Sequence, residues 1–130
     1  MGIKQMKRLE FIIYSQIIGG KNHMQIDPRS GRHYPNKRFA VWRDTVVRDL
    51  RFYLDQIKFT ESFDKPVSIQ VKYWNGDQRR RDVPAMWDSL FHVCEKAGVI
   101  TDDFLFQNCN WIAVKLDREE PRIEVEIEEL

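Results

Sequence analysis

The residues most able to do chemistry lie in one stretch of the sequence, between positions 79 and 103. Arg79 to Arg81 form a basic run that leads into Asp82, a second carboxylate follows at Asp88, and the stretch ends on Asp102 and Asp103. Hard divalent ions such as Mg²⁺ prefer oxygen ligands, often one or two carboxylates together with substrate phosphate. Arginines beside such acids can hold flanking phosphates through paired hydrogen bonds. The composition therefore fits a nuclease that hydrolyses phosphodiesters, although these residue types occur together in many other proteins.

The elements that must position these residues are two helices and several strands. Asp82 and Pro84 are typical of a helix start, Gly98 is typical of a helix end, and the apolar residues between them recur at helical spacing. Residues three or four apart stack on one helical face, which here would carry Pro84, Asp88, His92 and Glu95. The segment 37–58 shows the same periodicity, with Phe39 and Trp42 on its apolar side.

Strand patterns occupy most of the rest of the chain. The apolar run 9–18 and the segments 67–74, 106–116 and 122–128 are predicted strands. The segment 21–36 is predicted to be a basic loop because it lacks periodicity. We expect one small domain, 1–130, of the α/β (α+β) class, with a mixed sheet of about four strands and two main helices packed on it. The two C-terminal strands are predicted to be antiparallel.

Charge and cysteine usage narrow the class of protein. The net charge of +1 hides a basic segment, 21–51, and an acidic C-terminus, 119–129, which suits one anion-facing surface. Cys94 and Cys109 have neither CxxC spacing nor nearby histidines, so they are predicted to be reduced and mostly buried rather than zinc ligands. No apolar run approaches the roughly 20 residues that a membrane span needs, and we expect no membrane association.

The stretch 79–103 resembles the catalytic core of the RusA family of Holliday junction resolvases. In that family a basic run leads into Asp-x-Asp-Asn and a lysine on a helix, followed by Ala-Gly, a few apolar residues and Asp-Asp. Here RRRD gives Arg79 to Asp82, KAG gives Lys96 to Gly98, and ITDD gives Ile100 to Asp103, without a gap. More loosely, the loop asparagine in GGKNHM, the Gly-x-x-Tyr segment Gly31 to Tyr34 and a Trp-bearing helix follow the family's order. The resemblance implies a homodimer that cuts four-way DNA junctions symmetrically, using Mg²⁺ or Mn²⁺.

The sequence departs from the family pattern inside the predicted helix. The second aspartate, the asparagine and the lysine of the family are replaced by Pro84, Ala85 and Asp88. Positions 84 and 88 are one turn apart and share a face, so Asp88 can supply the carboxylate that position 84 lacks. Our hypothesis is that the catalytic residues, which are also the metal ligands, are Asp82, Asp88 and Asp103.

Each of these acids also has a simpler interpretation. Asp82 can cap the helix, an interaction worth about 1 kcal/mol, and Asp88 can be a solvated acid on a polar helix face. Asp102 and Asp103 can be ordinary turn residues; in a metal site, Asp102 would be a reserve or orienting acid. A histidine such as His92 is more often an idle surface residue than a ligand.

Basic residues in two regions are expected to contact DNA. Arginines beside an acid cluster favour phosphate contact over a solvated charge run, though not for every one of them. Lys21 or Lys37 can replace the family's helix lysine, and the sequence does not choose between them. A basic loop of this length is more often functional than idle. The predicted DNA-binding set is Lys21, Asn22, Lys37, Arg79, Arg80 and Arg81.

Three functions stay open. The first is an active dimeric endonuclease that resolves Holliday junctions in recombination and repair; the second is a catalytically silent relative that binds junctions. The third is a magnesium-dependent nuclease for flaps or other branched DNA. The retained Asp82 and Asp103 favour the first over the second, and nothing separates the first from the third or reveals base preference at the cut. We expect a cytoplasmic protein of a bacterial or phage-infected cell, and the family resemblance is consistent with a phage or prophage origin.

Overall fold

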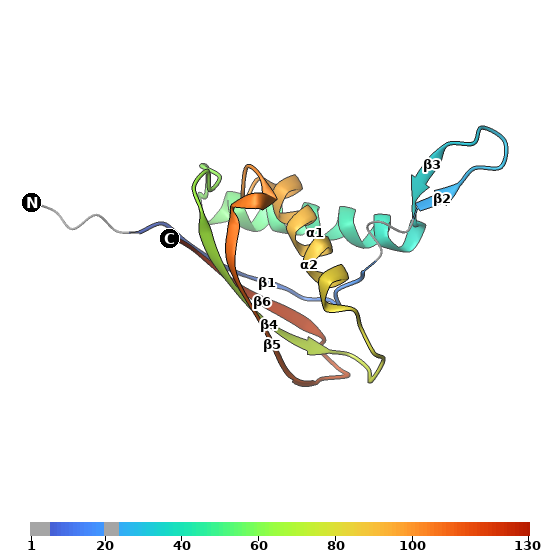
Figure 1. Cartoon of the computed structure of the whole chain (residues 1–130). Coiled ribbons are helices and arrows are strands. Elements are labelled where there is room, and N and C mark those ends of the chain that lie inside the picture. Colours follow the sequence, from blue (N-terminus) through green and yellow to red (C-terminus); the bar gives the residue numbers. More distant parts are fainter. Residues whose placement is uncertain (1–5, 20–23) are drawn as a thin grey trace, which may run out of the picture. The chain divides into compact units, whose positions relative to one another are not determined.

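The computed structural model of the chain describes residues 6–19 and 24–130, which group into two compact units (Figure 1). One unit holds the sheet and is built from the described residues up to 16, with 61–78 and 100–130. The other holds both long helices and a small hairpin, from the described residues of 17–60 and 79–99. The assignment of 1–130 to one domain stays a prediction. No helix in the described part is long and apolar enough to cross a membrane.

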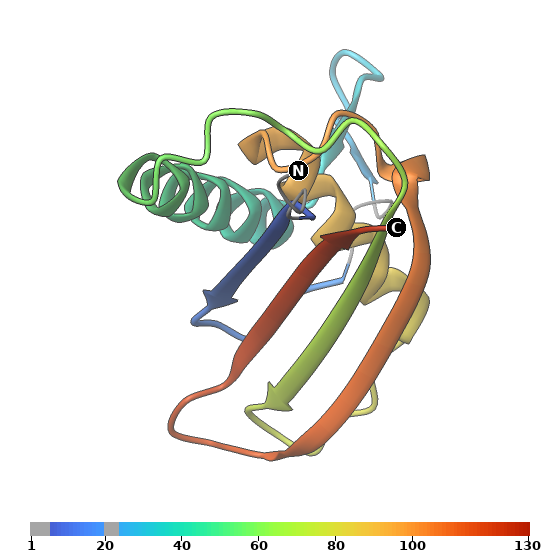
Figure 2. The same cartoon turned by 90° about the vertical axis from the view of Figure 1, so that its left-hand side faces the viewer.

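The sheet unit is a mixed sheet, as predicted, and Figure 2 shows it face on. Its strands lie in the order β1-β6-β4-β5 and have the bounds β1 (Arg8–Ile13), β6 (Arg122–Glu129), β4 (Val67–Asn75) and β5 (Phe106–Leu116). Strand β6 is antiparallel to β1 and β4, whereas β4 and β5 are parallel. The two C-terminal strands therefore run in opposite directions, but β4 lies between them.

Alternating apolar residues explain the register of the sheet. Burial alternates along β1 and β6, which is the pattern of strands with one buried face. The antiparallel register places buried residues opposite one another, in the pairs Leu9–Ile127, Phe11–Val125 and Ile13–Ile123. Cross-strand pairs of this kind are the unit of sheet stabilisation. The period of two in the sequence thus fixes which side chains face the core.

The first strand is shorter than predicted. It ends at Ile13 rather than at position 18, because Ile13 pairs with Ile123 and β6 begins only one residue earlier, at Arg122. Beyond this point Gln16 forms side-chain contacts in place of a ladder. Its amide nitrogen donates to the Asn75 side-chain oxygen at 3.1 Å, and its oxygen accepts the Gly76 N–H at 2.7 Å.

The helical unit contains the two predicted helices, α1 (Lys37–Gln56) and α2 (Val83–Ala97), which pack against each other. Helix α1 starts where the Asn36 side chain accepts two backbone N–H groups. The Arg51 guanidinium of α1 donates to the Lys96 carbonyl in the last turn of α2 at 2.7 Å. Helix α2 ends at Gly98, whose φ of 85° is a left-handed conformation that glycine adopts without strain.

Part of the predicted loop 21–36 is a two-stranded hairpin, which corrects the sequence prediction. Strand β2 (Met24–Ile26) pairs antiparallel with β3 (His33–Pro35). The strands are three residues each, too short for a periodic signal, and the turn between them is stabilised by hydrogen bonds within 27–32. Lys21 and Asn22, which were predicted to bind DNA, lie outside the described residues.

Candidate functional site

Asp82 stands at the N-terminus of α2 with its carboxylate free. It occupies the capping position, and its carbonyl accepts the Met86 N–H at 3.1 Å, but its side chain makes no capping hydrogen bond. The side chain is exposed, and no hydrogen bond or ion pair engages its carboxylate within the described structure. The simple interpretation of Asp82 as a side-chain helix cap is therefore wrong. A carboxylate without a protein partner can bind a cation without first breaking an internal bond.

Asp88 lies on the outward face of α2. It is exposed together with Pro84 and Glu95, while the opposite face buries Met86, Leu90 and the rest of the apolar stripe. Like Asp82, its carboxylate meets no hydrogen-bond or ion-pair partner among residues 6–19 and 24–130. His92 is half-buried, and its ring lies 6.1 Å from the Phe39 ring of α1. Packing against α1 thus accounts for part of the burial of the His92 side chain.

Ser89, between these positions, is a residue that sequence reasoning missed. It is fully buried, and its hydroxyl lies 2.7 Å from the Ile18 carbonyl and 3.1 Å from the Ala85 carbonyl. The segment 17–19 is thereby held against the first turns of α2. Gly19 fits there because an added Cβ would lie 3.2 Å from the Ala85 Cβ. A serine among apolar positions was the available signal, but its partner is 71 residues away.

The acidic pair 102–103 divides into one structural and one free carboxylate. The Asp102 side chain accepts the Phe104 N–H at 3.1 Å and caps the short 3₁₀ helix η1 (Asp103–Leu105). Asp103 is half-buried, and its carboxylate is engaged by no described residue. This favours Asp103 over Asp102 as the residue available to a ligand.

The predicted metal ligands are distributed over both units. Asp82 and Asp88 belong to the helical unit and Asp103 to the sheet unit. No group of three or more His, Cys, Asp or Glu that could hold a metal ion occurs among the described residues. The three-carboxylate site therefore stays a prediction.

The three arginines before α2 differ in their surroundings. Arg81 is half-buried, and its guanidinium donates to the Arg79 carbonyl at 3.2 Å. Arg80 is exposed and has no hydrogen-bond or ion-pair partner in the described part of the chain. Of the three, Arg80 presents the charge most available to a phosphate.

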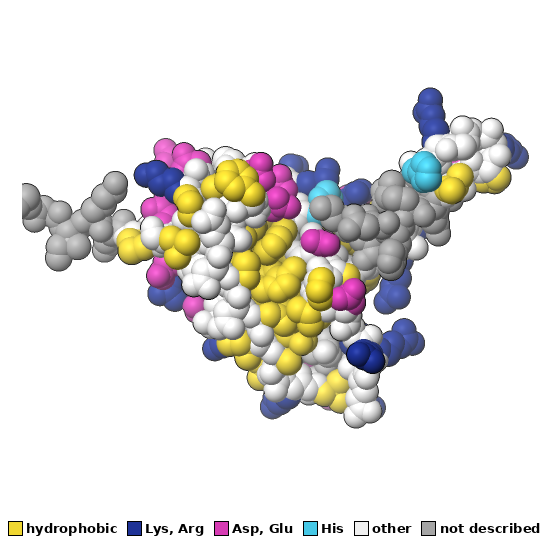
Figure 3. All heavy atoms as spheres, viewed as in Figure 1, with side chains coloured by type: hydrophobic (Ala, Val, Ile, Leu, Met, Phe, Trp, Pro, Cys, Tyr) yellow, Lys and Arg dark blue, Asp and Glu magenta, His cyan; other side chains and the backbone are white. Residues whose placement is uncertain are grey.

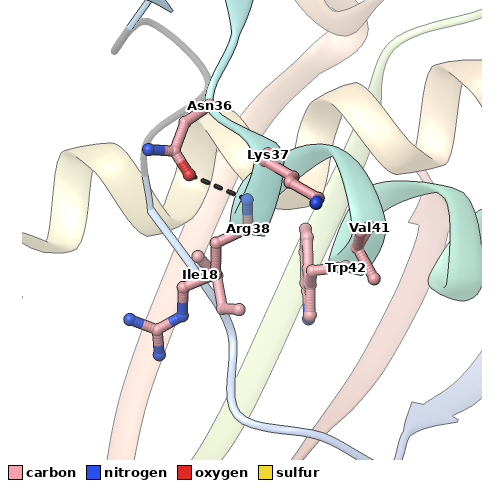
Figure 4. Close-up of a pocket in the computed structure, with 6 residues that line it drawn as sticks. All are labelled: Ile18, Asn36, Lys37, Arg38, Val41 and Trp42. Atoms are coloured by element: carbon pink, nitrogen blue, oxygen red, sulfur yellow. Dashed lines mark hydrogen bonds between the residues drawn. The ribbon is translucent and has the colours of Figure 1, made fainter.

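Lys37 begins α1 and lines an open pocket of about 630 Å³ (Figure 4). The pocket lies within the helical unit and is lined by Ile18, Asn36, Lys37, Arg38, Val41 and Trp42. The Asn36 oxygen accepts the Arg38 N–H at 2.9 Å, so Asn36 caps the helix as well as lining the pocket. Lys37 and Arg38 are exposed, and both cations lie where the α1 dipole also attracts anions.

The two cysteines are free, as predicted. Cys94 is buried on the apolar face of α2, and burial raises the pKa of its thiol. Cys109 is exposed on β5, contrary to the prediction that both are mostly buried, because β5 lies at the sheet edge. Partial burial of its thiol still raises the Cys109 pKa. A raised pKa leaves little thiolate, so neither residue is suited to nucleophilic catalysis.

No profile of a known protein family matches this chain. Among curated proteins, the chain is similar to the crossover junction endodeoxyribonuclease RusA of Aquifex aeolicus (strain VF5). The two sequences are 30% identical over 103 residues, which cover 79% of this chain and 78% of the relative. A match of this extent spans both units described above rather than a single motif. The chain therefore belongs to the RusA family of crossover junction endodeoxyribonucleases.

Proposed function

We propose that this chain is a metal-dependent, structure-selective endodeoxyribonuclease that resolves Holliday junctions by phosphodiester hydrolysis. The observation that carries the proposal is its similarity to the RusA endonuclease of Aquifex aeolicus over most of both chains. The free carboxylates of Asp82 and Asp88 support the same function, because a silent relative has no need to keep unpaired acids beside a basic run. Branched DNA with four arms is the proposed substrate.

The proposed metal ligands are Asp82, Asp88 and Asp103, and the proposed ion is Mg²⁺ or Mn²⁺. Their oxygen donors suit a hard cation, and no described residue competes for them. When bound, such an ion lowers the pKa of a water and stabilises charge on the scissile phosphate. Asp102 is proposed to orient the segment through its bond to Phe104 rather than to ligate.

Basic residues are proposed to hold the flanking phosphates. Arg80 is exposed next to Asp82, and a guanidinium can bind a phosphate through two parallel hydrogen bonds. Lys37 is the described candidate for the role of the family's helix lysine, with Arg38 beside it at the same pocket. Arg79, Arg81, Lys21 and Asn22 complete the proposed DNA-binding set.

The experiment is cleavage of a labelled synthetic four-way junction, beside linear duplex and flap substrates, with and without Mg²⁺ or Mn²⁺. Asp88→Asn tests the relocated ligand, and Asp102→Asn is its control, because it removes an acid that already has a backbone partner. We expect symmetric, metal-dependent cutting of the junction alone. It should be lost in Asp88→Asn and retained in Asp102→Asn.

The other outcomes separate the alternatives. Junction binding without cutting in any metal would mean a catalytically silent DNA-binding relative. Cutting of flaps in preference to junctions would mean a nuclease for other branched DNA. Full metal-dependent activity in Asp88→Asn would remove Asp88 from the ligand set and leave the proposed substrate intact.

A homodimer is part of the proposal, because symmetric cutting of a junction needs two active sites. Strand β6 is hydrogen-bonded on both sides, so its backbone cannot extend the sheet. Edge strand β1 has six residues and carries the ion pair between Arg8 and Glu10, whereas edge strand β5 has eleven residues with Lys115 as its only charge. Long, nearly uncharged edges favour pairing with another strand. We therefore infer that two copies pair antiparallel along β5, which keeps the two lysines at opposite ends of the ladder.

Sedimentation of the wild type and of Asn110→Lys/Ala113→Lys tests this interface, since added lysines block edge pairing. We expect the wild type at twice the 15.7 kDa chain mass and the variant as a monomer. The control Ile12→Lys/Tyr14→Lys adds the same charge at the end of β1 and just after it, and should stay dimeric. A dimeric β5 variant would exclude this interface.

A further inference from the structure

The hairpin of β2 and β3 ends in a well-defined turn, residues 27–32, which no part of the proposed catalytic site uses. The Asp27 carbonyl accepts the Gly31 N–H at 2.9 Å, and the Asp27 N–H donates to the Arg32 carbonyl at 2.9 Å. Gly31 has a φ of 69°, which a residue without Cβ adopts readily. The Ser30 hydroxyl accepts the Arg32 N–H at 3.2 Å. These bonds hold the backbone of the tip in one conformation.

The turn leaves two arginines exposed without a counter-charge. The only acid of the tip, Asp27, accepts the Arg29 backbone N–H at 2.9 Å, and this bond lowers the pKa of the Asp27 carboxyl. Its carboxylate thus serves the turn. The Arg29 and Arg32 side chains are exposed, and neither forms an ion pair or hydrogen bond within the described structure. Figure 3 shows basic side chains, in dark blue, at the end of the hairpin.

Two exposed arginines elsewhere in the chain, Arg8 and Arg48, are paired with acids. Arg8 lies 2.5 Å from Glu10, and Arg48 lies 3.2 Å from Asp49. These pairs neutralise charge locally. The Arg29 and Arg32 guanidinium groups have no such partner in the described structure, and the Asp27 carboxylate accepts a backbone N–H instead. The tip is therefore a concentrated positive site on an ordered support.

No hairpin residue whose side chain is described lies in the core. The strands of the hairpin have three residues each, and its apolar Ile26 is 60% exposed. A two-stranded ribbon of this size is marginally stable by itself. Figure 1 shows it projecting beyond the first turn of α1, in the same unit. Its shape and charge suit contact with a ligand rather than support of the fold.

We propose that this hairpin is a DNA-binding arm whose Arg29 and Arg32 each bind a backbone phosphate of the junction. The inference rests on the proposed function and adds a contact outside the acidic site. Guanidinium groups match phosphate geometry with two parallel hydrogen bonds. Phosphate contacts position a protein on DNA without reading its sequence, so the arm strengthens binding and leaves the chemical step unchanged.

The test is junction binding without divalent metal, at salt concentrations from about 50 to about 200 mM. The variants are Arg29→Ala/Arg32→Ala and the control Arg8→Ala/Arg48→Ala, which removes the same charge from paired arginines. Losing two phosphate contacts should reduce the slope of log affinity against log salt by about 1.8. Affinity near 100 mM salt should fall by about tenfold or more. The control should keep the wild-type slope.

Two further measurements keep the result interpretable. Arg29→Lys/Arg32→Lys should restore most of the slope, because lysine keeps the charge. Single-turnover cleavage at saturating protein should stay at the wild-type rate in the alanine variant. If the wild type binds no junction, the proposed function fails. If it binds and the alanine variant keeps its slope, or the control loses as much, the arm is excluded while the proposed function stands.

Discussion

The hairpin tip and the turn between β5 and β6 are built alike but present their arginines differently. In each turn an aspartate accepts backbone N–H groups of the next few residues: Asp27 at the tip, and Asp117 from Glu119 and Glu120. In the second turn Arg122 also donates to Asp117 at 3.0 Å and lies over the Trp74 ring at 4.0 Å from its centroid. At the tip, by contrast, both arginines remain exposed.

The difference shows that residue type alone does not separate a structural charge from an available one. Arg122 is largely shielded by its partners, with 21% of its side chain exposed, and it joins β4 to the start of β6. The backbone bonds from Glu120 and Glu119 and the adjacent Arg122 lower the pKa of the Asp117 carboxyl. An arginine whose charge is satisfied inside the protein has little left for DNA.

The same distinction divides the aspartates. Asp27, Asp102 and Asp117 accept backbone N–H groups at turns. Asp82, Asp88 and Asp103 do not, and no described residue engages their carboxylates. The three proposed ligands are among the unengaged carboxylates, so the comparison can be tested on activity and on stability separately.

The largest effect is expected on cleavage. Asp82→Asn should lower the single-turnover rate on a four-way junction by at least about 100-fold, because it removes a proposed metal ligand. Asp117→Asn should keep that rate and instead lower the urea midpoint, since the amide accepts these hydrogen bonds less strongly than a carboxylate. Both remove one negative charge, so each variant controls for the other. Equal cleavage rates in the two variants would contradict the assignment of unengaged acids to catalysis and engaged acids to stability.

A smaller effect is expected on stability. Arg122→Ala should lower the free energy of unfolding by about 2 kcal/mol, because it removes a charged hydrogen bond and a cation–π contact. Arg32→Ala should change it by less than about 0.5 kcal/mol, as is usual for exposed residues. Urea denaturation of both variants at neutral pH measures the difference. A loss at Arg32 as large as that at Arg122 would mean that the tip arginine has a structural role.

Local pattern was enough to predict most of the elements. The helical period placed α1 and α2 within about two residues of their ends. Strands were predicted at 106–116 and 122–128, the second from its alternation, and they correspond to β5 and β6. Pro84 and Gly98 marked the two ends of α2 correctly. Helices, strands and helix ends depend on residues that are neighbours in the chain. Their periodicity and backbone preferences can therefore be recognised from the sequence alone. The family pattern, too, is a matter of residue type and spacing.

Only the tertiary structure decided which partners each residue meets. The end of β1 depends on where β6 begins, over a hundred residues later, and the separation of the C-terminal strands depends on β4. Whether an aspartate is engaged, as Asp102 is, or free, as Asp103 is, depends on the backbone geometry of its turn. Hydrogen bonds and burial depend on which groups are close in space. Spacing along the chain determines this proximity only within one helix, strand or turn.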